Sequence, residues 1–138
     1  MKPFAWIEEY INDKQKYIDT ILENKKDDGL CHISKNEIAV KLEKSLSTVN
    51  KKIKAINKDE LIIIENGKDT FKIKKENFRE SKTVTNYLKL LKYFSIEGNY
   101  GKNEKEIIEE TGISYETIHF FKSKIPIDFR KSLKEKEL

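Results

Sequence analysis

The most constraining feature of this sequence is the order of helix caps and turn signals in its first half. Ser34 and Glu37 have the S-x-x-E spacing of a capping box, which predicts that a helix starts directly after the serine. Ser45 can cap a second helix after a short turn. Asn66 and Gly67 lie between two short β-branched and aromatic runs, a strong signal for a hairpin. This order predicts two short helices followed by a β-hairpin.

Hydrophobic spacing gives the extent of each element and its buried face. The elements expected in the first half are a long helix at 3–24, a short strand within 30–33, helices at 35–44 and 46–58, and strands at 61–65 and 70–74. The residues that the two short helices are expected to bury are Ile38, Ala39, Leu42, Val49, Ile53 and Ile56. On the last strand, Phe71 and Ile73 share one face and Lys72 points to the other.

The second half repeats the helical part of this pattern. The elements expected there are a polar connector at 75–82 and helices at 83–96, 104–110 and 115–124. The long helix is expected to bury Val84, Tyr87 or Leu88, Leu91, and Tyr93 or Phe94. Asn103 and Glu106 repeat the capping spacing, and Gly112 suits the turn between the last two helices. No convincing hairpin follows, although 125–129 can supply one short strand.

The two halves also resemble each other in sequence. The motif KNE at 35–37 recurs at 102–104, and the segment 45–56 aligns with 114–125. Each half reads as a long helix, a loop, a short helix, a turn and a second short helix. A duplication explains this likeness, and so do the similar capping and core requirements of two unrelated helix pairs.

Positive charge is concentrated in one window rather than spread along the chain. Residues 41–58 hold six lysines against the single acid Glu43, which gives a net charge of +5, whereas the whole chain carries +4. Such a concentration raises the local potential and attracts phosphate. A merely solvated helix face is the alternative interpretation. In 104–124, by contrast, five glutamates against three lysines give a net charge of −2.

Several classes of function are disfavoured by what the sequence lacks. The single Cys31 excludes an intramolecular disulfide and fits a reducing compartment. Cys31 and His32 are adjacent, which is a poor spacing for shared metal chelation, and no C-x-x-C or H-x-x-x-H motif is present. No apolar run is long enough to span a membrane, and acids come too early for a secretory signal. We therefore expect a cytoplasmic, non-enzymatic protein with no metal, no cofactor and no evident small-molecule ligand.

With these caps, the hairpin and the lysine window, the chain resembles the helix-turn-helix DNA-binding superfamily, with a winged first half. Ala39 fits the small residue that this family places in its first short helix. Gly112, Ile113 and Ser114 match the glycine, apolar residue and cap of the family's turn. Two such modules in one short chain are similar to small regulatory or accessory proteins of plasmids, phages and conjugative elements, although a fold alone does not fix a function.

The family pattern is incomplete at three positions. Glu43 and Lys44 replace the glycine and the apolar residue of the first turn, and Ile108 stands where alanine is usual. The resemblance implies a mainly α fold with a small β-hairpin wing, built from two fused helix-turn-helix modules. The first, at 1–78, is winged, and in the second, at 83–138, the wing is absent or reduced.

The resemblance also implies a role in holding double-stranded DNA. In this family the second helix of the motif, here 46–58, enters the major groove, and the wing, here 61–74, contacts the backbone or the minor groove. Asn50 can bond an adenine edge, and lysines can reach guanine or phosphate. The DNA-contacting residues that it implies are Lys41, Leu46, Ser47, Thr48, Asn50, Lys51, Lys52, Lys54, Lys68 and Lys72 in the first module and Tyr115, Thr117, His119 and Lys122 in the second.

Three questions stay open at the level of the sequence. The acidic second module either reads a second DNA box or uses its aromatic face for dimerisation or for a protein partner. A protein partner bound through Phe120 and Phe121 would make the chain an interaction adaptor. The protein is either an internal pseudo-dimer or a homodimer joined through its long first helix. Its role is either transcriptional regulation or help at the origin of a plasmid or mobile element.

Overall fold

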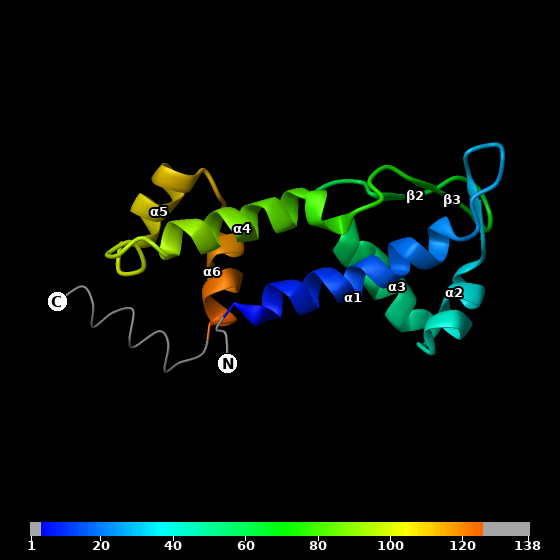
Figure 1. Ribbon diagram of the computed structural model, residues 1–138, viewed down its shortest axis with the longest axis horizontal. Helices are drawn as coiled ribbons and strands as arrows, with labels where there is room; N and C mark the ends of the chain where they lie inside the picture. The colour runs from blue at the N-terminus through cyan, green and yellow to red at the C-terminus, as the bar shows by residue number, and fades with distance from the viewer. Residues whose placement is uncertain (1–3, 126–138) are drawn as a thin grey trace. The chain divides into compact units, whose positions relative to one another are not determined.

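The computed structural model describes residues 4–125. In this part of the chain the fold is mainly α with a small three-stranded antiparallel sheet, as predicted (Figure 1). Its elements are α1 (Ala5–Leu22), β1 (Cys31–His32), α2 (Lys35–Leu42), α3 (Leu46–Ile56), β2 (Ile63–Glu65), β3 (Thr70–Ile73), the 3-10 helix η1 (Phe78–Glu80), α4 (Lys82–Phe94), α5 (Glu104–Thr111) and α6 (Tyr115–Ser123). None of the described helices is long and apolar enough to cross a membrane.

The chain divides into two compact units. One holds residues 9–83 and is called the sheet unit below; the other includes the described residues 4–8 and 84–125 and is called the helical unit. The strand expected at 125–129 lies outside the described residues, apart from its first position.

The sheet has the strand order β1-β3-β2, so the hairpin strand β2 is an edge strand. Cys31 pairs with Phe71, and Ile63 pairs with Ile73. The predicted hairpin is present, and the four residues 66–69 connect its strands, as the predicted strand bounds require. Gly67 and Asp69 both have positive φ, at 83° and 57°, which a wider loop with two left-handed residues requires.

The predicted caps start the two short helices of the sheet unit. The hydroxyl of Ser34 accepts from the N–H of Glu37 at 3.1 Å, and the Glu37 carboxylate accepts from the N–H of Ser34 at 3.3 Å, which completes the capping box. The hydroxyl of Ser45 accepts from the N–H of Thr48 at 3.1 Å. The helices therefore begin where the sequence predicted.

The core of the sheet unit contains nearly all the predicted apolar positions. Of the six residues assigned to α2 and α3, five are buried and Leu42 is half-buried. Phe78 corrects the prediction that 75–82 is merely polar, because its side chain is fully buried and packs 5.8 Å from the ring of Tyr10. One aromatic residue in a run of polar ones gives no periodic signal, so the sequence did not reveal this anchor.

Asn57, the residue that ends α3, connects this helix to the edge strand. Its side-chain oxygen accepts from the N–H groups of Ile62 and Ile63, at 2.9 Å each. Its amide nitrogen donates to the carbonyl of Ile63 at 2.8 Å. One side chain thus satisfies three backbone groups next to β2, of residues that are almost completely buried.

The turn between α2 and α3 is left-handed although it lacks glycine. Glu43 has φ 54° and ψ 44°, and Gly112 has φ 70° and ψ 14° at the equivalent end of α5. The N–H of Lys44 bonds to the carbonyl of Ala39 at 2.9 Å, which helps to hold the glutamate in this conformation. The departure from the family pattern at Glu43 therefore changes the residue but not the shape of the turn.

The helical unit has an aromatic core. Trp6 lies 5.3 Å from Tyr87 and 5.6 Å from Phe121, measured between ring centroids. In α4, Leu90 is fully buried and Leu91 is half-buried, which corrects the prediction for Leu91 by one position.

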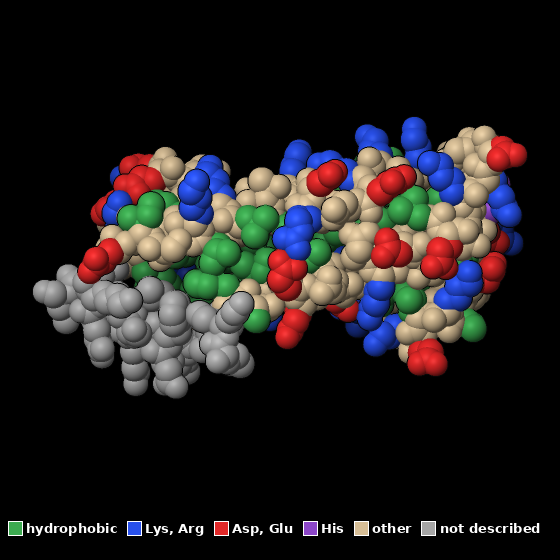
Figure 2. Space-filling view, in the orientation of Figure 1, with side chains coloured by type: hydrophobic (Ala, Val, Ile, Leu, Met, Phe, Trp, Pro, Cys, Tyr) green, Lys and Arg blue, Asp and Glu red, His purple; other side chains and the backbone are tan. Residues whose placement is uncertain are grey.

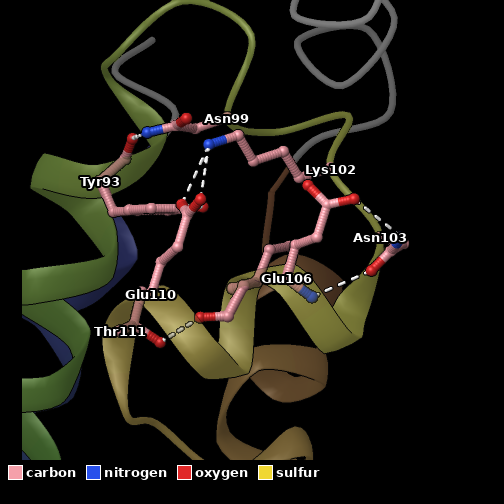
Figure 3. A network of polar contacts seen from close by, with 8 residues as sticks. Tyr93, Asn99, Lys102, Asn103, Glu106, Glu110 and Thr111 are labelled. Carbon is pink, nitrogen blue, oxygen red and sulfur yellow. Dashed lines mark hydrogen bonds and ion pairs between the residues drawn. The ribbon is translucent and has the colours of Figure 1, made fainter.

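A polar network connects α4 and α5 of the helical unit (Figure 3). The hydroxyl of Tyr93 donates to the Glu110 carboxylate, which also accepts from Lys102 at 2.9 Å. Burial and this bond raise the pKa of Tyr93, while the hydrogen bonds from Tyr93 and Lys102 lower the pKa of Glu110. The side chain of Asn99 donates to the carbonyl of Tyr93 at 2.9 Å. These contacts join the end of α4 to the following loop and to α5.

The two helix pairs match at a constant separation. Cap residues with the same role lie 69 positions apart, at 34 and 103, 43 and 112, and 45 and 114. Buried residues follow the same register in the pairs Ile38 and Ile107, Val49 and Ile118, and Ile56 and Ile125. The KNE motifs at 35–37 and 102–104 are two residues out of this register, so they are not equivalent positions.

Candidate nucleic-acid interface

The exposed side of α3 is a direct consequence of its buried side. Val49, Ile53 and Ile56 face the core, which leaves the positions between them to solvent. Leu46, Asn50 and Lys54 recur every four residues and therefore form one stripe along the helix. Lys58 lies just beyond the end of α3 and is again four positions further along the chain. This spacing is the sequence signal for Lys58, which was not among the predicted DNA-contacting residues.

The predicted residues of the sheet unit differ in exposure. Those with exposed side chains are Lys41, Leu46, Ser47, Lys51, Lys54, Lys68 and Lys72, and those that are half-buried are Thr48, Asn50 and Lys52. The N–H and the hydroxyl of Thr48 both bond to the Ser45 hydroxyl, so Thr48 completes the cap of α3. Among the described residues, no ion pair engages the ammonium groups of Lys41, Lys51, Lys54, Lys68 or Lys72.

Lys52 differs from these lysines because an acid within the sheet unit holds it. Its ammonium donates to the Asp13 carboxylate at 2.5 Å, and Lys14 approaches the same carboxylate at 3.2 Å. Burial alone would raise the pKa of Asp13, but the hydrogen bonds from Lys52 and Lys14 outweigh it and lower that pKa to about 2. The ammonium of Lys52 is therefore held in an ion pair within the fold, although Asp13 shares its single negative charge with Lys14 and Lys16.

A hollow of about 370 Å³ lies between the start of α3 and the hairpin loop. Leu46 and Asn50 line it from the helix, and Gly67 and Lys68 line it from the loop. The carboxylate of Glu65 is also at this hollow, where Lys35 pairs with it. The fold thus brings Asn50 and Lys68 to one concave surface, although 18 positions separate them in the sequence.

Lysine side chains are prominent on the surface of the sheet unit. On the face drawn in Figure 2, they stand over the region of β2 and β3 and around α2 and α3, with acidic side chains between them. Five of the six lysines in the window 41–58 are exposed, and the sixth, Lys52, is half-buried.

The four predicted residues of the second module lie in the helical unit. Tyr115 and His119 are exposed, with their rings stacked at a centroid distance of 5.7 Å. The N–H of Thr117 bonds to the Ser114 hydroxyl at 3.4 Å, so Thr117 repeats the capping role of Thr48. Lys122 is half-buried; its ammonium donates to the carbonyl of Tyr100 at 3.2 Å and lies 4.6 Å from the centre of that residue's ring. The fold thus uses two of the four residues for its own contacts.

Comparisons with known proteins give no further guidance. The chain matches no family model, no curated protein and no solved structure. Within residues 4–125, no three histidine, cysteine or acidic side chains come close enough together to hold a metal ion. Cys31 is buried, and burial raises the pKa of its thiol.

Proposed function

We propose that this protein binds double-stranded DNA through the sheet unit, as a winged helix-turn-helix. The observation that carries the proposal is the stripe of Leu46, Asn50 and Lys54 on α3. It is flanked by lysines that pair with no carboxylate of residues 4–125, and it is faced by a hairpin that carries Lys68. An α-helix fits the major groove of B-DNA, and a basic hairpin beside it can follow the backbone or enter the minor groove.

The residues of this surface divide into two roles. Lys41, Lys51, Lys54, Lys68 and Lys72 supply positive charge for phosphates, which fixes the position of the protein on the duplex. Asn50 lies on the line between Leu46 and Lys54, where a side-chain amide can make two hydrogen bonds to an adenine. Sequence preference should therefore depend on Asn50, while affinity should depend on the lysines.

The first test replaces two exposed lysines of α3. Lys51→Ala with Lys54→Ala should weaken binding to a duplex and lower the slope of log K against log salt by roughly two, because each phosphate contact contributes about one. Lys92→Ala with Lys105→Ala is a charge-matched control in the helical unit. An unchanged affinity and slope in the α3 variant would refute the proposal, and equal losses in both variants would indicate non-specific attraction.

Selection from random-sequence duplexes at near-physiological salt tests the sequence preference. Enrichment of one motif, relaxed at a single base position in the Asn50→Ala variant, would support base reading by α3. An inverted repeat would indicate a homodimer, whereas two unlike boxes would indicate that both helix pairs read DNA. With such a preference, the protein would act in the cytoplasm as a transcriptional regulator or as an accessory factor at a plasmid or mobile-element origin.

The helical unit favours a second, protein-binding role. The exposed glutamates of α5 and α6 are Glu104, Glu106, Glu109, Glu110 and Glu116, and these would repel phosphates. The ammonium of Lys122 is engaged within the unit. We therefore expect Tyr115→Ala with His119→Ala to leave DNA affinity unchanged. A loss of affinity would instead place α6 on the duplex.

A further inference from the structure

A second groove of the sheet unit lies between the later part of α3 and the edge strand β2. Its volume is about 800 Å³. Lys54 and Lys58 line it from the helix side, and Leu61 and Ile64 line it from the strand side. It shares Asn50 and Lys54 with the proposed DNA surface, but it extends away from the hairpin loop toward the start of β2.

The strand side of this groove is aliphatic and open. Leu61 keeps 62% of its surface exposed, and Ile64 beside it is half-buried. Phosphates and sugars offer such side chains little to pack against, so DNA binding does not account for them. An aliphatic side chain from a ligand would remove this surface from water, which is the main favourable contribution at most binding sites.

The helix side of the groove is basic. Within the described residues, the ammonium groups of Lys54 and Lys58 have no carboxylate partner. At the other end, Glu65 is paired with Lys35, so its negative charge is compensated. A ligand that satisfies both sides must therefore carry negative charge toward α3 and an apolar group toward β2.

We propose that this groove binds an extended acidic segment of a partner protein, in which acidic and apolar residues alternate. Lys54 lies in the last turn of α3 and Lys58 follows the end of that helix, so both present an ammonium group to the same side of the groove. In an extended chain, residues two positions apart lie about 6.7 Å from each other on the same side, and the residue between them points the opposite way. Two acids can thus face the lysines while the intervening apolar side chain packs against Leu61.

Side chains rather than the backbone must supply most of the recognition. Asn57 already occupies the N–H and the carbonyl of Ile63, so a peptide cannot pair with the edge of β2 at this residue. The inference goes beyond DNA binding and stands without it. Asn50 and Lys54 line this groove and also belong to the α3 stripe. If the protein binds both ligands, the peptide segment would therefore compete with DNA.

The test uses the full-length protein and a fluorescein-labelled peptide of about ten residues with alternating Asp and Leu. Binding of the peptide is measured by fluorescence anisotropy. We expect saturable binding, with at least a tenfold loss when Ala replaces each Leu or Asn replaces each Asp of the peptide. Leu61→Ser should weaken binding by a similar factor. Val40→Ser, which alters an even more exposed aliphatic residue of α2, should not change it.

A charge reversal gives an independent readout if Leu61→Ser disturbs the fold. Lys58→Glu should lose the Asp-Leu peptide and gain affinity for a peptide in which Lys replaces Asp, and circular dichroism would confirm that both variants are folded. The proposal is overturned if the Asp-Leu peptide does not bind the wild type. It is also overturned if the Asp-Ala peptide binds equally well, or if Val40→Ser weakens binding as much as Leu61→Ser.

Discussion

Replacing Asn57 by alanine should be one of the most damaging single changes to a polar side chain in the sheet unit. The substitution removes three hydrogen bonds, of 2.8, 2.9 and 2.9 Å, that satisfy backbone groups of Ile62 and Ile63. Both isoleucines are at most 1% exposed, so water cannot readily take the place of the lost side chain. With about 1 kcal/mol for each bond, the free energy of unfolding should fall by about 3 kcal/mol.

The assay is urea denaturation followed by circular dichroism, with two companion variants. Asn57→Asp keeps the oxygen that accepts from two N–H groups but loses the donor to the carbonyl of Ile63, so it should lose about a third as much stability. Asn50→Ala changes an asparagine that has no hydrogen bond within the described part of the chain, and it should lose less than about 0.5 kcal/mol. If Asn57→Ala costs no more than Asn50→Ala, the side chain does not hold β2 and the reasoning fails.

Two further predictions concern the turn after α2 and the ion pair between Asp13 and Lys52. Glu43→Gly should raise the free energy of unfolding by about 1 kcal/mol, because glycine adopts the left-handed conformation without steric cost. Urea denaturation measures this gain, and Glu43→Ala, which keeps the steric cost, should not show it. Asp13 has its pKa lowered to about 2 by Lys52 and Lys14 against the effect of burial, so its contribution is present above about pH 4 and is lost as the pH falls toward 2. Between about pH 4 and pH 2 the free energy of unfolding of the wild type should fall by about 1 kcal/mol more than that of Asp13→Asn. If the two proteins lose stability in parallel as the pH falls, the Asp13 ion pairs do not contribute as described.

The local features of the fold could be read from the sequence. Each cap involves a side chain and an N–H only three residues away, so the spacing of Ser34 and Glu37 or of Ser45 and Thr48 is sufficient to define it. The buried faces of α2 and α3 follow in the same way from helical periodicity. The mainly α class, the small sheet and the exposed stripe of α3 were therefore predictable before any tertiary contact was known.

Contacts between residues that are distant along the chain were decided only by the tertiary structure. Lys52 and Asp13 are 39 positions apart, and their pairing removes a predicted phosphate-binding lysine from the exposed set. Gln15 accepts from the N–H of Phe78, 63 positions away, in a segment that the sequence presented as a polar connector. Such pairs carry no local spacing signal, because their geometry exists only after the chain has folded.

Two aspects of the candidate sites belong to this second class. The sequence marks Asn50 and Lys54 as outward-facing positions of a helix. The position of the hairpin relative to α3 depends on tertiary contacts, among them the hydrogen bonds by which Asn57 connects α3 to β2. Leu61 likewise reads as an ordinary strand residue, and only the packing of the edge strand leaves it exposed in a groove. The sequence alone determined which residues face outward from α3, because helical periodicity is local; folding decided which surfaces they share, because those surfaces depend on long-range packing.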